Sequence, residues 1–248
     1  MKNTAAIVLA AGKGKRMKSD LPKVLHEILG KPMLRHVLDT LKSININKIA
    51  VVVGHKAEMV QSQMADFDGN LDFILQAKQL GTGHAVMVTE EALADFEGNI
   101  LVVAGDVPFL SQETTKKLIE VHEHEGAAAT VLSSRPDDPT GYGRVIRQPG
   151  TDLVDYIIEH KDASDEERKV NEINTGIFCF DSRYLFESLK EIRSENSQNE
   201  YYLTDIMAIL RKKGLKAAVS VTDDTDEVLG VNSVEQKDEL ERKFAGRR

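Results

Sequence analysis

A short stretch near the N-terminus combines small residues with positive charge. An apolar run over 5–9 leads into Leu9–Lys23, where two alanines, Gly12 and Gly14 let the backbone approach a ligand closely. Amide N–H groups left free in such a loop form a concavity that binds anions. Asp20 is its one acid, set against five cations, which is +4 in a chain of net charge −8: Lys13, Lys15, Arg16, Lys18 and Lys23. The pattern predicts a loop that holds phosphate groups.

Two better-known phosphate-binding patterns do not fit this loop. The dinucleotide fingerprint G-x-G-x-x-G and the Walker A pattern both require a glycine where Met17 stands. A plain turn after a first strand, with solvated lysines, also remains open from the spacing alone.

Asp106 is a second candidate for chemistry. It follows Gly105 and the buried-strand pattern of 101–104. A carboxylate there points into the ligand crevice of an open α/β sheet. Mg²⁺ takes one or two protein oxygens and fills its other positions with water and substrate phosphates. By spacing alone, a turn or capping role before Pro108 fits Asp106 equally well.

A third candidate is the stretch from Gln76 to Ala85. A glutamine amide both donates and accepts, which suits the edge of a uracil ring. Gly81 and Thr82 bring backbone groups and a hydroxyl close to a base and its ribose. A loop glutamine beside a helix cap has the same pattern.

Polar residues suited to sugar hydroxyls occur further along the chain. Gly143 is small, the Glu159 carboxylate accepts hydrogen bonds, and the Asn174 amide both donates and accepts. Each alone is explained as well by a hairpin turn or a strand end. Asn232 is, by its position, a candidate N-cap for a last helix.

The loop pattern L-A-A-G-x-G-x-R-M followed by P-K resembles the signature of the sugar-nucleotide pyrophosphorylases, which make NDP-sugars. The resemblance extends from Leu9 to Asn232 through Q-x-x-Q-L-G-T-G-H-A, G-D-V-P-F-L, P-T-G-Y-G-R and E-x-x-G-V-N. These stretches are similar to the branch that transfers uridylyl groups to N-acetylglucosamine 1-phosphate. Lys15 departs from the usual Thr of the family, and Ala104 departs from an aromatic residue.

The resemblance implies in-line attack by N-acetylglucosamine 1-phosphate on the α-phosphorus of UTP, which yields UDP-N-acetylglucosamine and pyrophosphate. It implies catalytic roles for Arg16, Lys23 and Asp106, and Mg²⁺ held by Asp106 and Asn232. The implied nucleotide-binding residues are Leu9, Ala10, Ala11, Gly12, Lys23, Gln76, Gly81, Thr82 and Gly105. The implied sugar-binding residues are Gly143, Glu159, Asn174 and Asn232. Two alternatives stay open: another sugar 1-phosphate such as glucose 1-phosphate, and a non-catalytic nucleotide-sugar-binding protein.

Composition and charge indicate which partners and which cellular location to expect. The net charge of −8 argues against a nucleic-acid binder. The single cysteine, Cys179, excludes an internal disulfide and fits a reducing cytoplasm. No stretch has the layout of a signal peptide or the length of a membrane span. We therefore expect a cytoplasmic protein that does not bind membranes, and a homo-oligomer stays open.

Strand and helix patterns alternate through the first half of the chain. Strands are expected over 4–10, 49–53, 71–75, 100–104 and 127–132. Helices are expected over 33–41, 57–64, 82–93 with Thr82 as cap, and from Ser111. This order predicts an α/β fold with a Rossmann-like, mostly parallel sheet and helices on both faces. Gly12, Gln76–Thr82 and Asp106 should then meet at one rim.

The second half has a different pattern. Strands are expected over 141–148, 153–160, 173–180 and 216–221, helices over 184–189, 203–210 and 233–244, and an exposed polar tract over 161–172. His122 and His124 should lie on different faces of a solvated helix end.

We expect one nucleotidyltransferase domain over 1–248. Residues 1–135 would form its nucleotide-binding half, and 136–248 a smaller, β-containing sugar-binding lobe with the C-terminal helix. Bifunctional members of the resembled branch continue into a left-handed β-helix acetyltransferase domain of hexapeptide repeats. This sequence shows no such repeats, so uridylyltransfer alone is expected.

Overall fold

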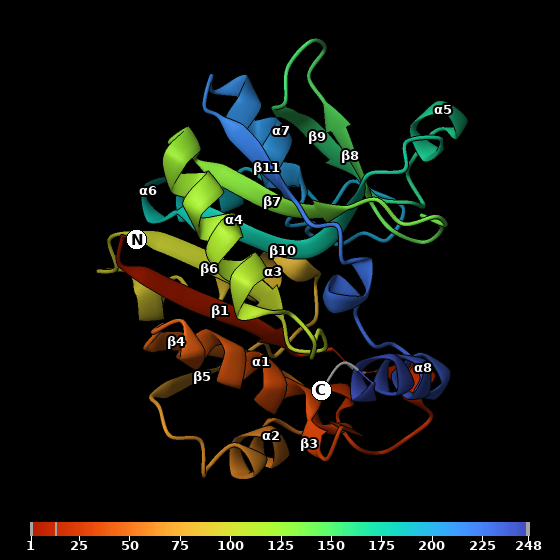
Figure 1. Ribbon diagram of the computed structural model, residues 1–248. Helices are drawn as coiled ribbons and strands as arrows, with labels where there is room; N and C mark the ends of the chain where they lie inside the picture. Colours follow the sequence, from red (N-terminus) through yellow and green to blue (C-terminus); the bar gives the residue numbers. More distant parts are fainter. Residues whose placement is uncertain (1, 13, 247–248) are drawn as a thin grey trace.

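The computed structural model of the chain describes residues 2–12 and 14–246. Lys13, one of the five cations of the N-terminal loop, lies outside the described residues. The described part is built on a nine-stranded sheet with the order β11-β7-β10-β6-β1-β4-β5, to which β8 and β9 are joined through β10 (Figure 1). The expected α/β fold with a central sheet and flanking helices is confirmed.

Four parallel strands form the part of the sheet nearest the N-terminal loop. They are β6 (Asn99–Ala104), β1 (Thr4–Ala10), β4 (Lys48–Val53) and β5 (Leu71–Leu75). Leu9 near the end of β1 is paired with Val52 on one side and Ala104 on the other. Because these strands run in the same direction, the loops that follow them leave from one edge of the sheet.

The rest of the sheet is mixed. β10 (Ile173–Asp181) runs antiparallel between β6 and β7 (Ala129–Ser134), and β11 (Ala217–Val221) is parallel to β7. β8 (Arg144–Arg147) and β9 (Val154–Ile158) form a hairpin attached to β10. The strand expected over 127–132 therefore does not neighbour β6, because a strand from the second half of the chain lies between them.

Each face of the sheet packs against its own helices. On one face, Ala6 and Val8 of β1 pack in a core with α1 (Met33–Ser43), α2 (Ala57–Gln63) and α4 (Gln112–Glu125). On the other face, Ala5 and Ile7 join a second core with α3 (Thr82–Met87), α6 (Ser182–Leu189) and α7 (Asp205–Lys212). This period of two is what a strand buried on both faces requires. Figure 1 shows α1 and α4 in front of the sheet, with α3 and α6 behind it.

The expected helix over 82–93 is shorter, and its expected cap is wrong. α3 ends at Met87, and a separate 3₁₀ turn, η3 (Glu91–Leu93), follows. Gly81 takes the N-cap position without a side-chain bond. The Thr82 hydroxyl instead accepts the backbone N–H of Leu203 at 3.1 Å. A tertiary contact therefore uses the oxygen that local sequence assigns to capping.

The last helix has a different cap from the one its position suggested. α8 (Val234–Ala245) begins after Ser233, whose hydroxyl accepts the backbone N–H of Gln236. Asn232 is therefore not the N-cap, and its own backbone N–H donates to the Gln236 side chain at 2.9 Å. The side-chain amide of Asn232 therefore makes its contacts outside α8.

Two residues that were expected to be exposed are buried, Glu172 and His122. The tract over 161–172 contains the exposed helix α5 (Asp165–Arg168), but Glu172 at its end is buried and accepts from Arg147 Nη2 at 2.7 Å and Ser133 at 2.6 Å. His122 is also buried, with Nδ1 2.9 Å from the Thr130 hydroxyl, and burial lowers its pKa to about 4. His124 is exposed, so the two histidines do lie on different faces.

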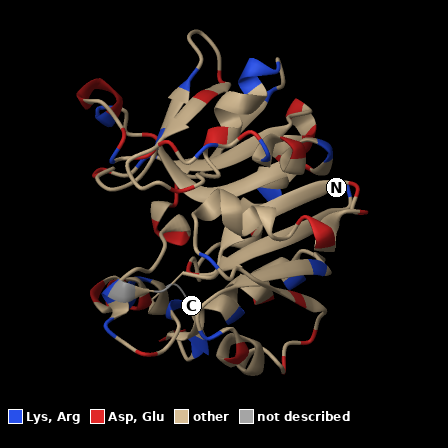
Figure 2. Cartoon of the chain, turned by 180° about the vertical axis from the view of Figure 1, so that it is seen from behind, with Lys and Arg blue, Asp and Glu red and all other residues tan. Residues whose placement is uncertain are grey.

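The remaining elements are short: β2 (Glu27–Ile28), β3 (Lys31–Pro32), η1 (Lys15–Met17), η2 (Lys23–Leu25) and η4 (Thr225–Val228). They span too few residues to show a hydrophobic period. Figure 2 shows charges of both signs interspersed on helices and loops, while the strands are largely uncharged. Within the described part of the chain, no helix combines the length and apolar character needed to cross a bilayer.

Candidate active site

A cavity of about 290 Å³ lies at the carboxyl ends of the parallel strands. Leu9 of β1 and Ala11, Gly12 and Lys23 of the segment after it contribute to its lining. The loop after β5 contributes Gln76, Gly81 and Thr82, and Asp106 follows β6. The three segments expected at one rim are therefore together, because β1, β5 and β6 all end at this edge.

Two of the residues expected to bind nucleotide lie behind this lining. Ala10 is buried in the core on the α1 face. Gly105 donates its N–H to the Leu9 carbonyl at 2.9 Å, and an added Cβ would meet Leu34 and Val24 at 3.3 Å. Both residues support the wall of the cavity.

Lys23 joins two residues that are far apart in the sequence. Its Nζ is ion-paired with the Asp106 carboxylate and donates to Asn232 Oδ1 at 3.0 Å. The backbone N–H of Val231 donates to the backbone oxygen of Asp106 at 2.9 Å, which fixes the two segments against each other. The expected ligand pair Asp106 and Asn232 thus presents a carboxylate oxygen and an amide oxygen to one cation.

This donor set fits a hard divalent cation. Mg²⁺ prefers oxygen ligands and uses few from the protein. The oxygens of Asp106 and Asn232 already converge on a positive charge, the Lys23 ammonium. In the described ranges, no group of three or more His, Cys, Asp or Glu side chains is placed to hold a metal.

Arg16 lies exposed in the 3₁₀ turn η1 and is not part of the cavity lining. Burial raises the pKa of the Tyr142 hydroxyl; the charge of Arg16 opposes this shift and that of Asp106 adds to it. Tyr142 is therefore within electrostatic reach of both residues. It belongs to the G-Y-G-R stretch, so the sugar-side loop reaches the cationic loop.

The Gln76 amide is buried in the wall of the cavity. Its Nε2 donates to the Gly81 carbonyl at 3.2 Å and lies 3.0 Å from His84 Nδ1. Burial lowers the pKa of His84, which favours the neutral ring, and a neutral ring can accept this hydrogen bond at Nδ1. His84 therefore orients Gln76.

Gly81 is packed directly against the second half of the chain. Its φ is +109°, and an added Cβ would lie 2.5 Å from the Tyr201 carbonyl oxygen. Tyr201 also donates to the Leu80 carbonyl at 2.8 Å and accepts from the Gly83 N–H at 2.7 Å. The stretch over 200–205 therefore holds the loop after β5 in place.

Three of the four sugar-side candidates are brought together by the β8–β9 hairpin and β10, and Asn232 lies with Lys23. The Asn174 N–H donates to the Gly143 carbonyl at 2.9 Å, and an added Cβ on Gly143 would lie 3.4 Å from both Glu159 carboxylate oxygens. Burial raises the pKa of Glu159; Thr204 opposes the shift, while Asp162 and Asp205 add to it. Burial and Asp162 also raise the pKa of Asp205, to about 6.

Two polar residues of the lining were absent from the candidates. Gln79 donates to the Ala11 carbonyl at 3.0 Å and so ties the loop after β5 to the N-terminal loop. Glu200 reaches the cavity from the second half. Gln79 stands inside the Q-x-x-Q-L-G-T-G-H-A stretch that carries the family resemblance, and that was the available signal for it.

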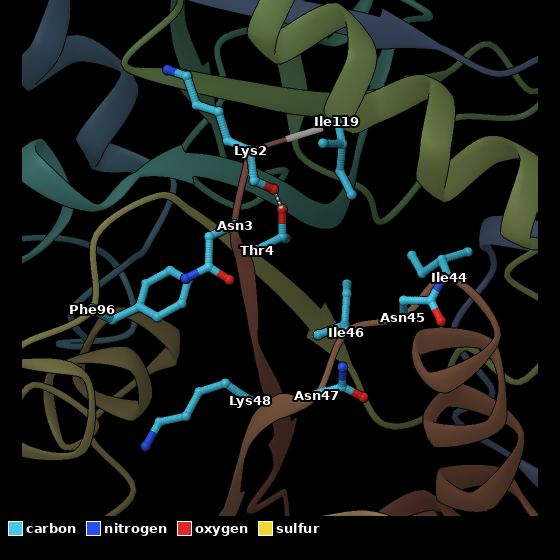
Figure 3. Close-up of a pocket in the computed structure, with 10 residues that line it drawn as sticks. All are labelled: Lys2, Asn3, Thr4, Ile44, Asn45, Ile46, Asn47, Lys48, Phe96 and Ile119. Carbon is cyan, nitrogen blue, oxygen red and sulfur yellow. Dashed lines mark hydrogen bonds between the residues drawn. The ribbon is translucent and has the colours of Figure 1, made fainter.

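A larger cavity of about 560 Å³ lies at the other end of the sheet (Figure 3). It is lined by Lys2, Asn3 and Thr4 at the start of β1 and by Lys48 at the start of β4, and the Thr4 hydroxyl donates to the Lys2 carbonyl. In open α/β sheets ligands bind beyond the carboxyl ends of the strands. The smaller cavity is therefore the candidate active site.

Comparison with known proteins agrees with this geometry. Residues 6–202 match the MobA-like NTP transferase domain. The chain is 50% identical over 232 residues to the "Bifunctional protein GlmU" of Enterococcus faecalis and 51% identical to that of Streptococcus suis, which is 94% of this chain and 50% of each relative. The chain thus spans about half the length of the curated relatives it matches.

Two solved structures share the fold. One is UDP-glucose pyrophosphorylase complexed with UDP-glucose, with a TM-score of 0.77, 18% identity and full coverage of both chains. The other is a putative glucose-1-phosphate thymidylyltransferase from Bacillus anthracis in complex with a sucrose, with a TM-score of 0.75, 21% identity, and coverage of 97% of this chain and 94% of that one. From its match over residues 6–202, the chain belongs to the family of MobA-like NTP transferase domains.

Proposed function

We propose that this chain transfers UMP from UTP to N-acetylglucosamine 1-phosphate and releases pyrophosphate. One observation carries the proposal: Lys23 joins Asp106 and Asn232 beside a cavity whose other walls are Gly12 and Gln76. The identity to two proteins named bifunctional GlmU, across 94% of this chain, supports it, as does the resemblance to the branch that makes UDP-N-acetylglucosamine.

The sugar phosphate is already an anion, so the reaction needs no general base. The obstacle is the repulsion between two polyanions, and catalysis then rests on positioning and charge neutralisation. Arg16 neutralises the triphosphate and the departing pyrophosphate, and Lys23 bridges the incoming phosphate and the α-phosphate. The backbone at Ala11 and Gly12 carries no large side chain, which lets phosphates approach it.

The loop after β5 recognises the base of the nucleotide. Gln76 is oriented by His84 and by the Gly81 carbonyl, so its amide meets the uracil edge in one arrangement. Gly81 and Thr82 are fixed by Tyr201 and Leu203. A rigid wall of this kind favours one base over others without a closing motion.

The sugar lies against Gly143, Glu159 and Asn174. Glu159 accepts from a sugar hydroxyl or amide, and Thr204 holds the carboxylate through a contact of 3.3 Å. Asp106 and Asn232 would hold Mg²⁺, which, when bound, would orient the α-phosphate and stabilise the charge that develops there. The cytoplasm, where a single buried thiol such as Cys179 stays reduced, is the proposed location.

A pyrophosphate-release assay that crosses several NTPs with several sugar 1-phosphates tests the proposal. UTP with N-acetylglucosamine 1-phosphate should give the highest kcat/KM, and release should depend on added Mg²⁺. A preference for glucose 1-phosphate would indicate a different uridylyltransferase. Nucleotide-sugar binding without any pyrophosphate release would indicate a sensor and contradict the proposal.

A further inference from the structure

The Lys23 ammonium occupies the point where two oxygen donors converge. It is ion-paired with Asp106 and donates to Asn232 Oδ1 at 3.0 Å. The side chains of Lys23 and Asp106 are only 15% and 13% exposed. Water therefore competes weakly for this contact, and the free protein carries an internal cation at the expected metal position.

The segments that carry the two donors are held together without Lys23. The Val231 N–H donates to the Asp106 backbone oxygen at 2.9 Å, and Asn232 Nδ2 donates to the Gly230 carbonyl at 3.0 Å. The second bond engages the amide nitrogen and so turns Oδ1 toward Lys23. The Asn232 oxygen and the backbone that carries Asp106 therefore keep their positions when Lys23 leaves.

An ammonium and a divalent cation cannot share these oxygens. Mg²⁺ and Mn²⁺ use the same lone pairs that Nζ now occupies. Positive charges within a few ångströms of each other also repel strongly at a site shielded from water. We infer that Lys23 is a built-in competitor for the metal: a divalent cation binds at Asp106 and Asn232 by displacing the Lys23 ammonium, which is released toward the phosphate-binding loop.

The stem of Lys23 determines where the released ammonium remains. An added Cβ on Gly14 would lie 2.6 Å from Lys23 Cβ, so the stem packs directly against the loop backbone. Once displaced, the charge stays beside the segment proposed to hold phosphates. The inference rests on the proposed function here, since it makes metal and nucleotide triphosphate favour each other's binding. By linkage this effect is reciprocal.

The test uses Mn²⁺ alone as the probe, with no nucleotide present. Its affinity is measured by titration calorimetry or by the electron paramagnetic resonance of free Mn²⁺. Lys23→Met removes the charge and keeps most of the stem. It should bind Mn²⁺ roughly tenfold more tightly than wild type or better, the range of an ordinary coupling between sites.

Two controls show whether the gain in Mn²⁺ affinity arises at the Asp106 site. Lys18→Met removes a charge from an exposed lysine of the same loop and should change Mn²⁺ affinity by about twofold or less, because exposed charges are screened. Adding Asp106→Ala to Lys23→Met should abolish the gain. A gain that persists in this double variant overturns the inference, because the metal would then be bound elsewhere.

A measurement on the wild-type protein tests the displacement of Lys23 even if Lys23→Met does not fold. Lysine acetylation is followed by mass spectrometry with and without Mn²⁺. Labelling of Lys23 should rise several-fold with the metal, while that of Lys18 stays constant. Unchanged Lys23 labelling overturns the inference, as does Mn²⁺ affinity in Lys23→Met no tighter than in Lys18→Met.

Uridylyl transfer by wild type is assayed separately. If transfer is absent but the metal displaces Lys23, the proposed function fails and the competition stands. If transfer is normal but Lys23 does not respond to Mn²⁺, the competition fails and the function stands.

Discussion

Phe109 and Phe244 stack face to face, with ring centroids 3.7 Å apart and ring planes within 2°. Phe109 belongs to the segment that carries Asp106, and Phe244 belongs to α8, the helix that follows Asn232. The Leu29 N–H also donates to the Glu241 carboxylate on α8 at 2.7 Å. α8 therefore fastens the segment of Asn232 to the half of the chain that carries Asp106 and Lys23 (Figure 1).

Phe244→Ala should loosen this attachment. An aromatic pair contributes about 0.5–1.5 kcal/mol beyond the area it buries. We expect a lower Tm and a higher Mg²⁺ concentration for half-maximal pyrophosphate release, because Asn232 is held less firmly. Val234→Ala removes an exposed apolar side chain from the same helix and is the matched control. An unchanged Mg²⁺ requirement in Phe244→Ala would show that α8 does not position Asn232.

Lys23→Ala and Asp106→Ala should each lower kcat by roughly 10²–10³, the loss expected when one preorganised charged group is removed. Circular dichroism should show that both variants remain folded. Lys31→Ala, which removes an exposed lysine paired with Asp39, should retain wild-type turnover. Near-normal turnover in either of the first two variants would refute their catalytic assignment.

The elements around the site could be predicted from sequence, whereas the contacts between them could not. β1 has the expected bounds because a strand buried in a parallel sheet is a continuous apolar run. β5 also has the expected bounds, although it is a half-buried strand at the edge of the sheet. The shared rim of Gly12, Gln76 and Asp106 follows from the common direction of the strands.

Local sequence patterns do not show which residues far apart in the chain contact each other. Lys23 and Asn232 are 209 positions apart, and no periodicity links them. The position of β10 between β6 and β7 is likewise a choice among pairings that all bury an apolar strand. Thr82 and Ser233 show the same limit for caps, because only the fold decides which hydroxyl is free to cap.

Gly81→Ala should damage the nucleotide side of the site. The residue has φ +109°, and its added Cβ would lie 2.5 Å from the Tyr201 carbonyl oxygen. Positive φ alone costs about 1–3 kcal/mol for a residue other than glycine, and the contact forces the two segments apart. The KM for UTP should rise and the free energy of unfolding should fall.

Gly214→Ala separates strain from contact, because Gly214 has φ +71° with nothing within 4 Å of an added Cβ. It should lose stability and keep the wild-type KM for UTP. If both glycine variants raised this KM equally, packing of Gly81 against Tyr201 would have no specific role.

Asp205→Asn should stabilise the protein at neutral pH. Burial and Asp162 raise the pKa of Asp205 to about 6, so above that pH folding confines a charge that it disfavours. Below the unfolded-state pKa the carboxyl is neutral in both states and the penalty vanishes. After allowance for partial exposure, we expect a gain of about 1–2 kcal/mol near neutral pH. Urea unfolding at about pH 7.5 and about pH 4 measures it. An equal gain at both pH values would contradict a charge effect.

Arg144→Lys should weaken sugar binding selectively. Arg144 is 2% exposed, its guanidinium donates to the carbonyls of Tyr142 and Arg168, and its Nε has no hydrogen-bond partner among the described residues. One planar guanidinium thus holds the peptide before Gly143 in place. The single ammonium of a lysine cannot make the same pair of hydrogen bonds. The KM for the sugar 1-phosphate should rise several-fold with the KM for UTP unchanged. Arg168→Lys, at a more exposed position on α5, should leave both constants unchanged. Equal rises in both KM values for Arg144→Lys would indicate general loosening of the fold.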